Sequence, residues 1–160
     1  MFPMSLRSLA KHVQPIAIAA MFLFAVSGSA AAAPLDLAAY KGKVVYLDFW
    51  ASWCKPCRQS FPWMNELTDL YGSDGFVVIA VNVDHEPDLA ADFLRQNAAD
   101  FKVVYDPGGD LAEKYNVQAM PTSVLIGRDG RVRYVHSGFY PHKEGDYLAH
   151  IRALLNQKAS

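Results

Sequence analysis

Residues 48–57 read DFWASWCKPC and hold both cysteines of the chain, Cys54 and Cys57. Disulfide exchange needs a thiolate that attacks and a second thiol near enough to resolve the mixed disulfide. The Cys-x-x-Cys spacing, between a predicted strand and a predicted helix, supplies both. A passive disulfide is the weaker alternative, because a bridge that closes so short a loop constrains the unfolded chain very little. A zinc site is also disfavoured, since no second pair of cysteines exists to complete four ligands.

The positions of the two cysteines predict different roles for them. Cys54 is expected at the N-terminus of the following helix, where the helix dipole and free N–H groups favour a thiolate and lower its pKa. Cys57, inside the first turn, is expected to be more buried. We therefore assign Cys54 as the nucleophile and Cys57 as the resolving thiol. Lys55 either favours the thiolate modestly or is simply an exposed lysine, and Pro56 suits the start of a helix.

Asp48 interrupts an apolar run of strand formers, residues 44–50, whose composition fits a strand buried on both faces. A buried carboxylate is costly, and it is usually either paired or raised in pKa. If it lies beneath the cysteines, Asp48 can accept the proton of Cys57, directly or through water. The alternative is that Asp48 faces solvent at the edge of the strand. We favour the catalytic interpretation.

The rest of the chain predicts alternating strands and helices. The expected strands cover residues 44–50, 76–83, 102–105, 122–126 and 131–136, and the expected helices cover residues 57–71, 87–98, 110–115 and 144–155. A turn at residues 128–130 joins the last two strands as a hairpin. This order predicts an α/β sandwich with parallel strands, crossover helices and an antiparallel hairpin at one edge. We expect one domain over residues 34–160.

Residues 1–33 have the order of a secretory signal peptide. Arg7 and Lys11 precede an apolar run over residues 16–26, and small residues follow up to Ala33. That run is short for a membrane span, which takes roughly 20 residues, and an uncleaved anchor is the alternative interpretation. In both cases we expect an exported domain, soluble in the periplasm or extracytoplasmic space or tethered to the membrane.

Residues 48–57, followed by Pro62, resemble the active-site segment of thioredoxin, and residues 120–122 (Met-Pro-Thr) resemble its cis-proline loop. An additional helix and strand between residues 84 and 117 make the chain similar to the TlpA/ResA branch of exported thioredoxin-like proteins. The resemblance implies a thioredoxin-like fold, a central mixed sheet flanked by helices with an extra central helix–strand insertion. It also implies a cis bond before Pro121, opposite the Cys pair, although the local pattern alone gives cis little weight.

The resemblance further implies a protein-disulfide reductase whose redox centre is the Cys54–Cys57 disulfide, with no other cofactor and no metal. Its partners would be disulfide-containing exported proteins, such as apocytochrome c in cytochrome c biogenesis or copper-site proteins. A membrane thiol reductase would supply the electrons, and we expect a monomer. The residues expected to contact substrate are Trp53, Lys55, Pro56, Met120 and Pro121.

Three other functions share part of this pattern. A dithiol oxidase of the same fold would run the exchange in the opposite direction, and the sequence leaves the direction open. A thiol peroxidase is disfavoured because Ala51 stands three residues before Cys54, where peroxidases of similar fold carry a threonine. A copper chaperone would add His85 or His136 to the cysteines, but such chaperones usually space their cysteines by three residues. A net charge of -1 without a basic stripe argues against nucleic-acid binding.

Overall fold

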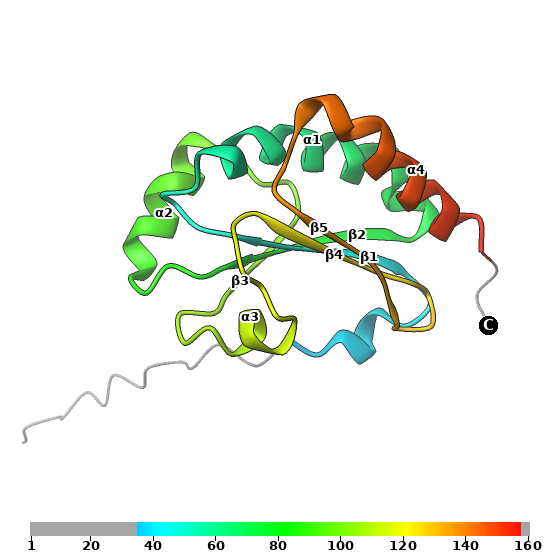
Figure 1. Ribbon diagram of the computed structural model, residues 1–160, viewed down its shortest axis with the longest axis horizontal. Coiled ribbons are helices and arrows are strands. Elements are labelled where there is room, and N and C mark those ends of the chain that lie inside the picture. The colour runs from blue at the N-terminus through cyan, green and yellow to red at the C-terminus, as the bar shows by residue number, and fades with distance from the viewer. Residues whose placement is uncertain (1–34, 158–160) are drawn as a thin grey trace, which may run out of the picture. The chain divides into compact units, whose positions relative to one another are not determined.

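A five-stranded mixed sheet forms the centre of the computed structural model, which describes residues 35–157 (Figure 1). The strands are β1 (Val44–Trp50), β2 (Phe76–Asn82), β3 (Lys102–Tyr105), β4 (Thr122–Ile126) and β5 (Val132–Ser137), in the order β3-β2-β1-β4-β5. β1, β2 and β3 are parallel, whereas β4 is antiparallel to β1 and β5 is antiparallel to β4. The expected mixed sheet with a hairpin at one edge is confirmed. The predicted signal peptide, residues 1–33, lies outside the described residues.

Helices cover both faces of the sheet. They are α1 (Lys55–Tyr71), α2 (Pro87–Gln96), α3 (Asp110–Lys114) and α4 (Glu144–Leu155), with short 3-10 helices η1 (Leu37–Tyr40), η2 (Gly72–Asp74) and η3 (Pro141–Lys143). α1, α2 and α4 lie over one face, and α3 and η1 lie over the other (Figure 1). Among the described residues, no helix combines the length and apolarity that crossing a membrane requires.

β1 is buried along its whole length, as its apolar composition predicts. Successive side chains of a strand point to opposite faces, so β1 contributes to two separate apolar clusters. Tyr46 and Trp50 join the cluster under α1, and Leu47 and Phe49 join the cluster on the α3 side. Asp48 has the parity of Tyr46 and Trp50 and therefore belongs to the α1 face. Its place is fixed by the alternation of the strand.

The two largest boundary differences from the sequence expectation, of two residues each, have local reasons. α1 begins at Lys55, two residues earlier than expected, because the Cys54 side chain caps the helix and brings Lys55 and Pro56 into its first turn. α2 ends at Gln96 rather than at residue 98, because the backbone of Asn97 is extended and its side-chain amide donates to the carbonyl of Phe93 as a C-cap.

Candidate active site

The two cysteines lie where β1 leads into α1, and they form a disulfide with each other. Cys54 is the N-cap residue, and its Sγ accepts the backbone N–H of Cys57 at 3.2 Å. The N-terminal N–H groups of a helix and the helix dipole both favour negative charge at this point. The predicted position of Cys54 at the N-terminus of the helix is therefore confirmed.

Burial separates the two sulfur-bearing residues in the expected order. Cys57 is fully buried, whereas Cys54 keeps 3% of its surface exposed. The neighbouring residues Trp53, Lys55 and Pro56 are exposed, Trp53 to 69%. Solvent therefore reaches the pair from the side of Trp53 and Cys54, and Cys57 lies beneath. The exposure of Lys55 means that solvent screens its charge.

Asp48 is fully buried, which excludes the alternative of a solvent-facing edge position. It shares the α1 face of the sheet with the cluster that contains Cys57. Burial raises the pKa of Asp48 from 3.8 to about 7, and a hydrogen bond from Ser123 opposes part of that rise. A carboxyl group with a pKa near neutrality exchanges protons readily at physiological pH.

The Met120–Pro121 peptide bond is cis, as the family resemblance implied and the local pattern alone did not. Antiparallel pairing of β4 with β1 sets Thr122 opposite Phe49, so the loop that carries Pro121 emerges beside the end of β1 that leads to the cysteines. Pro121 is buried and Met120 is half-buried. The carbonyl of Pro121 accepts the N–H of Gly138 at 2.7 Å, which ties this loop to the end of β5.

Asp84 is a site residue that the sequence analysis missed. Its carboxylate accepts both the backbone N–H and the hydroxyl of Ser52, at 2.9 and 3.0 Å, and the side-chain amide of Asn82 at 2.8 Å. These bonds fasten the loop before Cys54 to the end of β2. The signal available in the sequence was two polar residues, Asn82 and Asp84, at the end of an apolar strand, where the ends of parallel strands meet.

Ser123 and Tyr46 also lie next to a predicted site residue without having been predicted. The hydroxyl of Ser123 donates to Asp48 Oδ1 at 2.6 Å, and the Tyr46 hydroxyl donates to Ser123 Oγ at 2.7 Å. All three side chains are buried. Asp48 is thus the end of a hydrogen-bonded row rather than an isolated acid.

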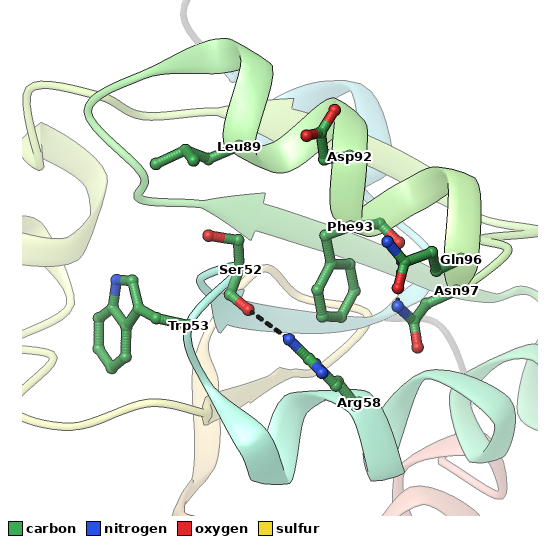
Figure 2. Close-up of a pocket in the computed structure, with 8 residues that line it drawn as sticks. All are labelled: Ser52, Trp53, Arg58, Leu89, Asp92, Phe93, Gln96 and Asn97. Carbon is green, nitrogen blue, oxygen red and sulfur yellow. Dashed lines mark hydrogen bonds between the residues drawn. The ribbon is translucent and has the colours of Figure 1, made fainter.

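A shallow pocket opens beside the cysteine loop, between α1 and α2 (Figure 2). Trp53 and Ser52 form one side, and Arg58 reaches from α1 to donate to the Ser52 carbonyl at 3.4 Å. The residues that line it are Ser52, Trp53, Arg58, Leu89, Asp92, Phe93, Gln96 and Asn97. The pocket adjoins the exposed face of Trp53, so a partner docked on Trp53 also meets α2.

The histidines considered for a copper site are engaged elsewhere. His85 lies in the loop before α2, and its Nδ1 is 2.9 Å from the carbonyl oxygen of Pro107. His136 lies on β5 and His150 lies on α4, and Nε2 of His136 is 3.0 Å from Nδ1 of His150. Within residues 35–157, no group of three or more histidine, cysteine or acidic side chains is arranged to hold a metal ion.

The chain is similar to known thiol-disulfide oxidoreductases. A thiol-disulfide oxidoreductase ResA from Bacillus thuringiensis subsp. konkukian is 41% identical over 98 residues, which are 61% of this chain and 57% of that protein. The ResA of Bacillus subtilis is 35% identical over 65% of this chain and 58% of its own length. The chain therefore matches less than two thirds of the length of these curated relatives.

Solved structures show the same fold. A Chlorobium tepidum structure described as a thiol:disulfide interchange protein DsbE has a TM-score of 0.75 at 48% identity, covering 76% of this chain and 86% of that one. The exposed lipoprotein thioredoxin Etrx1 of Streptococcus pneumoniae has a TM-score of 0.64 at 35% identity, over 74% and 90%. The Redoxin family model matches residues 24–151. With its thioredoxin-like sheet and its capped Cys pair, this chain belongs to the redoxin family.

Proposed function

We propose that this protein is a thiol–disulfide oxidoreductase that reduces disulfides of exported proteins through Cys54 and Cys57. One observation carries the proposal: Cys54 caps α1 next to the exposed Trp53 and keeps 3% of its surface exposed, while its bonded partner Cys57 is fully buried, on the sheet face that also holds Asp48. This arrangement gives one sulfur to attack and a second to resolve. The names of the ResA relatives support the same chemistry.

Reduction proceeds in two exchanges. The Cys54 thiolate attacks one sulfur of the substrate disulfide, so the substrate S–S bond breaks, a mixed disulfide forms and the first substrate thiolate leaves and takes up a proton. Cys57 then gives its proton to Asp48 and attacks Cys54 Sγ. The mixed disulfide breaks and the second substrate thiolate leaves, to be protonated by Asp48 or solvent. Two electrons pass to the substrate, and the Cys54–Cys57 disulfide remains.

Each turnover must be followed by reduction of the Cys54–Cys57 disulfide by an external dithiol. A membrane thiol reductase is the donor that suits an exported domain, and residues 1–33 support export by their charge and apolar order. Among substrates, apocytochrome c and copper-site proteins fit, because their cysteines must be reduced before they bind haem or metal. Trp53, Lys55, Pro56 and the Met120–Pro121 loop would contact the substrate chain, with the Met120 backbone pairing to it, and the protein would act as a monomer.

The dithiol oxidase is the second candidate, because it uses the same two sulfurs in the reverse direction. The reduction potential distinguishes the two functions, since about 30 mV corresponds to 1.4 kcal/mol for a two-electron couple. A potential near that of thioredoxin, about -270 mV, supports the reductase. A potential near -120 mV, that of a strong dithiol oxidant, would assign the oxidase.

Trapping tests the proposed roles directly. Reduced Cys57→Ser protein should attack insulin or an exported disulfide protein and stay joined to it, because no resolving thiol remains. Non-reducing gels with mass spectrometry detect the adduct. Cys54→Ser is the matched control and should trap nothing, since Cys57 is fully buried. Adducts on Cys54→Ser alone would reverse the roles, and a wild-type protein that reduces no disulfide substrate would refute the function.

A further inference from the structure

Asp48 accepts one hydrogen bond, from the end of a short row of hydroxyl groups set up by the register of the sheet. Asp48 and Ser123 are direct partners on the antiparallel strands β1 and β4. Tyr46 lies two residues before Asp48 on β1 and therefore points to the same face. Tyr46 donates to Ser123 at 2.7 Å and Ser123 donates to Asp48 Oδ1 at 2.6 Å.

The row has a single direction because of what each group can donate. Burial raises the pKa of Tyr46 well above its ordinary value, so its phenol keeps the proton and donates it. The hydroxyl of Ser123 has one proton, which it donates to Asp48 Oδ1. Asp48 Oδ2 is buried and has no hydrogen-bond partner. It is therefore the oxygen available for a proton, and Oδ1 can accept from Ser123 whether or not Oδ2 is protonated.

Among the described residues, no charged side chain forms an ion pair with Asp48 in place of the hydroxyl groups. The titratable groups on the same face are Tyr46 on β1, Cys57 on α1, Tyr147 on α4 and, opposite Ser123 on β5, His136. Among the described residues, no lysine, arginine or histidine forms an ion pair with Asp48. The hydrogen bond from Ser123, which in turn accepts one from Tyr46, is thus the interaction that stabilises the buried carboxylate of Asp48.

We infer that Ser123, assisted by Tyr46, is a positioning residue that stabilises the carboxylate form of Asp48 and leaves Oδ2 as its proton-accepting atom. The inference rests on the proposed function, in which Asp48 takes the proton of Cys57. It adds Tyr46 of β1 and Ser123 of β4 to the cysteines and Asp48 as residues that take part in the reaction indirectly. Ser123 acts on the resolving step through Asp48 and has no part in the first attack by Cys54.

A two-step probe separates these steps. Reduced protein mixed with 5,5′-dithiobis(2-nitrobenzoate) releases one coloured thiolate when Cys54 attacks and a second when Cys57 resolves the mixed disulfide. Ser123→Ala removes a hydrogen bond to a charged group, so the pH midpoint of the second phase should rise by about one unit, with up to about a tenfold slower second phase at pH 7. The first phase should stay within about twofold of wild type.

Conservative and control variants distinguish positioning from packing. Ser123→Thr keeps the hydroxyl and should restore the second phase, and Tyr46→Phe should move it in the direction of Ser123→Ala by less. Thr68→Ala and Tyr71→Phe are matched controls, because each removes a hydroxyl that bonds elsewhere, to Met64 and to Arg152, and should leave both phases unchanged.

Direct titration of Asp48 completes the test. Carbon-13 NMR of the aspartate carboxyl groups should show the Asp48 midpoint higher in Ser123→Ala than in wild type and restored in Ser123→Thr. An unchanged second phase and Asp48 midpoint in Ser123→Ala, or failure of Ser123→Thr to restore them, would overturn the inference. Absence of the first phase in wild type would instead refute the proposed function, so the two failures are distinct.

Discussion

Asp48 and His136 lie on the same face of the sheet with one strand between them, and Ser123 of β4 is the register partner of both. Burial acts on the two groups in opposite senses. It raises the pKa of Asp48 from 3.8 to about 7, whereas it lowers that of His136, with help from His150, from 6.5 to about 4. Burial therefore moves the pKa of the acid toward neutral pH and moves the pKa of the base away from it.

Their surroundings differ as much as their pKa values. Asp48 lies on the central strand β1, which leads into the cysteine loop, and it accepts a hydrogen bond from the hydroxyl of Ser123. His136 lies on the edge strand β5, half-buried, and its neighbours are His150 and the ring of Tyr147, whose centroid is 4.7 Å from its own. Burial alone thus does not mark a catalytic group. The pKa that burial produces, raised to about 7 in Asp48 and lowered to about 4 in His136, distinguishes the two groups.

The largest expected effect is on stability, from Asp48→Asn. Between pH 3.8 and about 7 the unfolded chain has lost the Asp48 proton while the folded protein keeps it, so the free energy of unfolding falls as pH rises. At pH 8 this costs at most about 4 kcal/mol. Asp48→Asn should recover that amount in urea unfolding at pH 8 and should slow the Cys57 step.

The pH dependence separates charge from packing in that experiment. Below pH 3.8, Asp48 is protonated in both states and the variant should match wild type. A gain of equal size at pH 4 and pH 8 would show that better packing, and not the buried charge, explains it. No gain at pH 8 would contradict the raised pKa of Asp48.

His136→Phe tests a second pH dependence of the free energy of unfolding, which has the opposite sign to that of Asp48 and a smaller size. Because its folded pKa is lowered to about 4, wild-type His136 contributes stability that is present above pH 6.5 and is lost as the pH falls toward 4. Since the side chain is only half-buried, solvent screening leaves about 1 kcal/mol of that effect. Urea unfolding at pH 7 and pH 4.5 measures it: the variant should lose less stability on acidification than wild type. An equal loss would remove His136 as the cause.

The comparison also shows what the sequence could predict. Asp48 was predictable because one acid stood in an otherwise apolar run, and the Cys-x-x-Cys spacing placed the site. Ser123 and Tyr46 were not, because their role depends on which residue of β4 faces which residue of β1. That register comes from tertiary pairing, and a shift of one residue would turn Ser123 to the opposite face.

Asp84 escaped prediction for a related reason. It follows β2 in sequence, yet it holds Ser52, 32 residues earlier in the chain. The parallel pairing of β1 and β2 brings their ends together, with Trp50 opposite Asn82. The cis form of Pro121 was likewise indicated by family resemblance and not by the local pattern. Local chemistry thus predicted the reactive residues, and long-range pairing supplied those that hold them.

The smallest expected effect is that of His150→Phe on the pKa of His136. The substitution keeps an aromatic ring against Tyr134, whose centroid is 4.0 Å from that of His150, and removes the nitrogen bonded to His136. Burial is the larger cause of the lowered His136 pKa and persists, so the pKa should rise only part of the way from about 4 toward 6.5. NMR titration of the imidazole protons measures it, with His142→Phe as the control on an exposed histidine. A full return to 6.5 would show that the neighbouring imidazole, rather than burial, keeps His136 neutral.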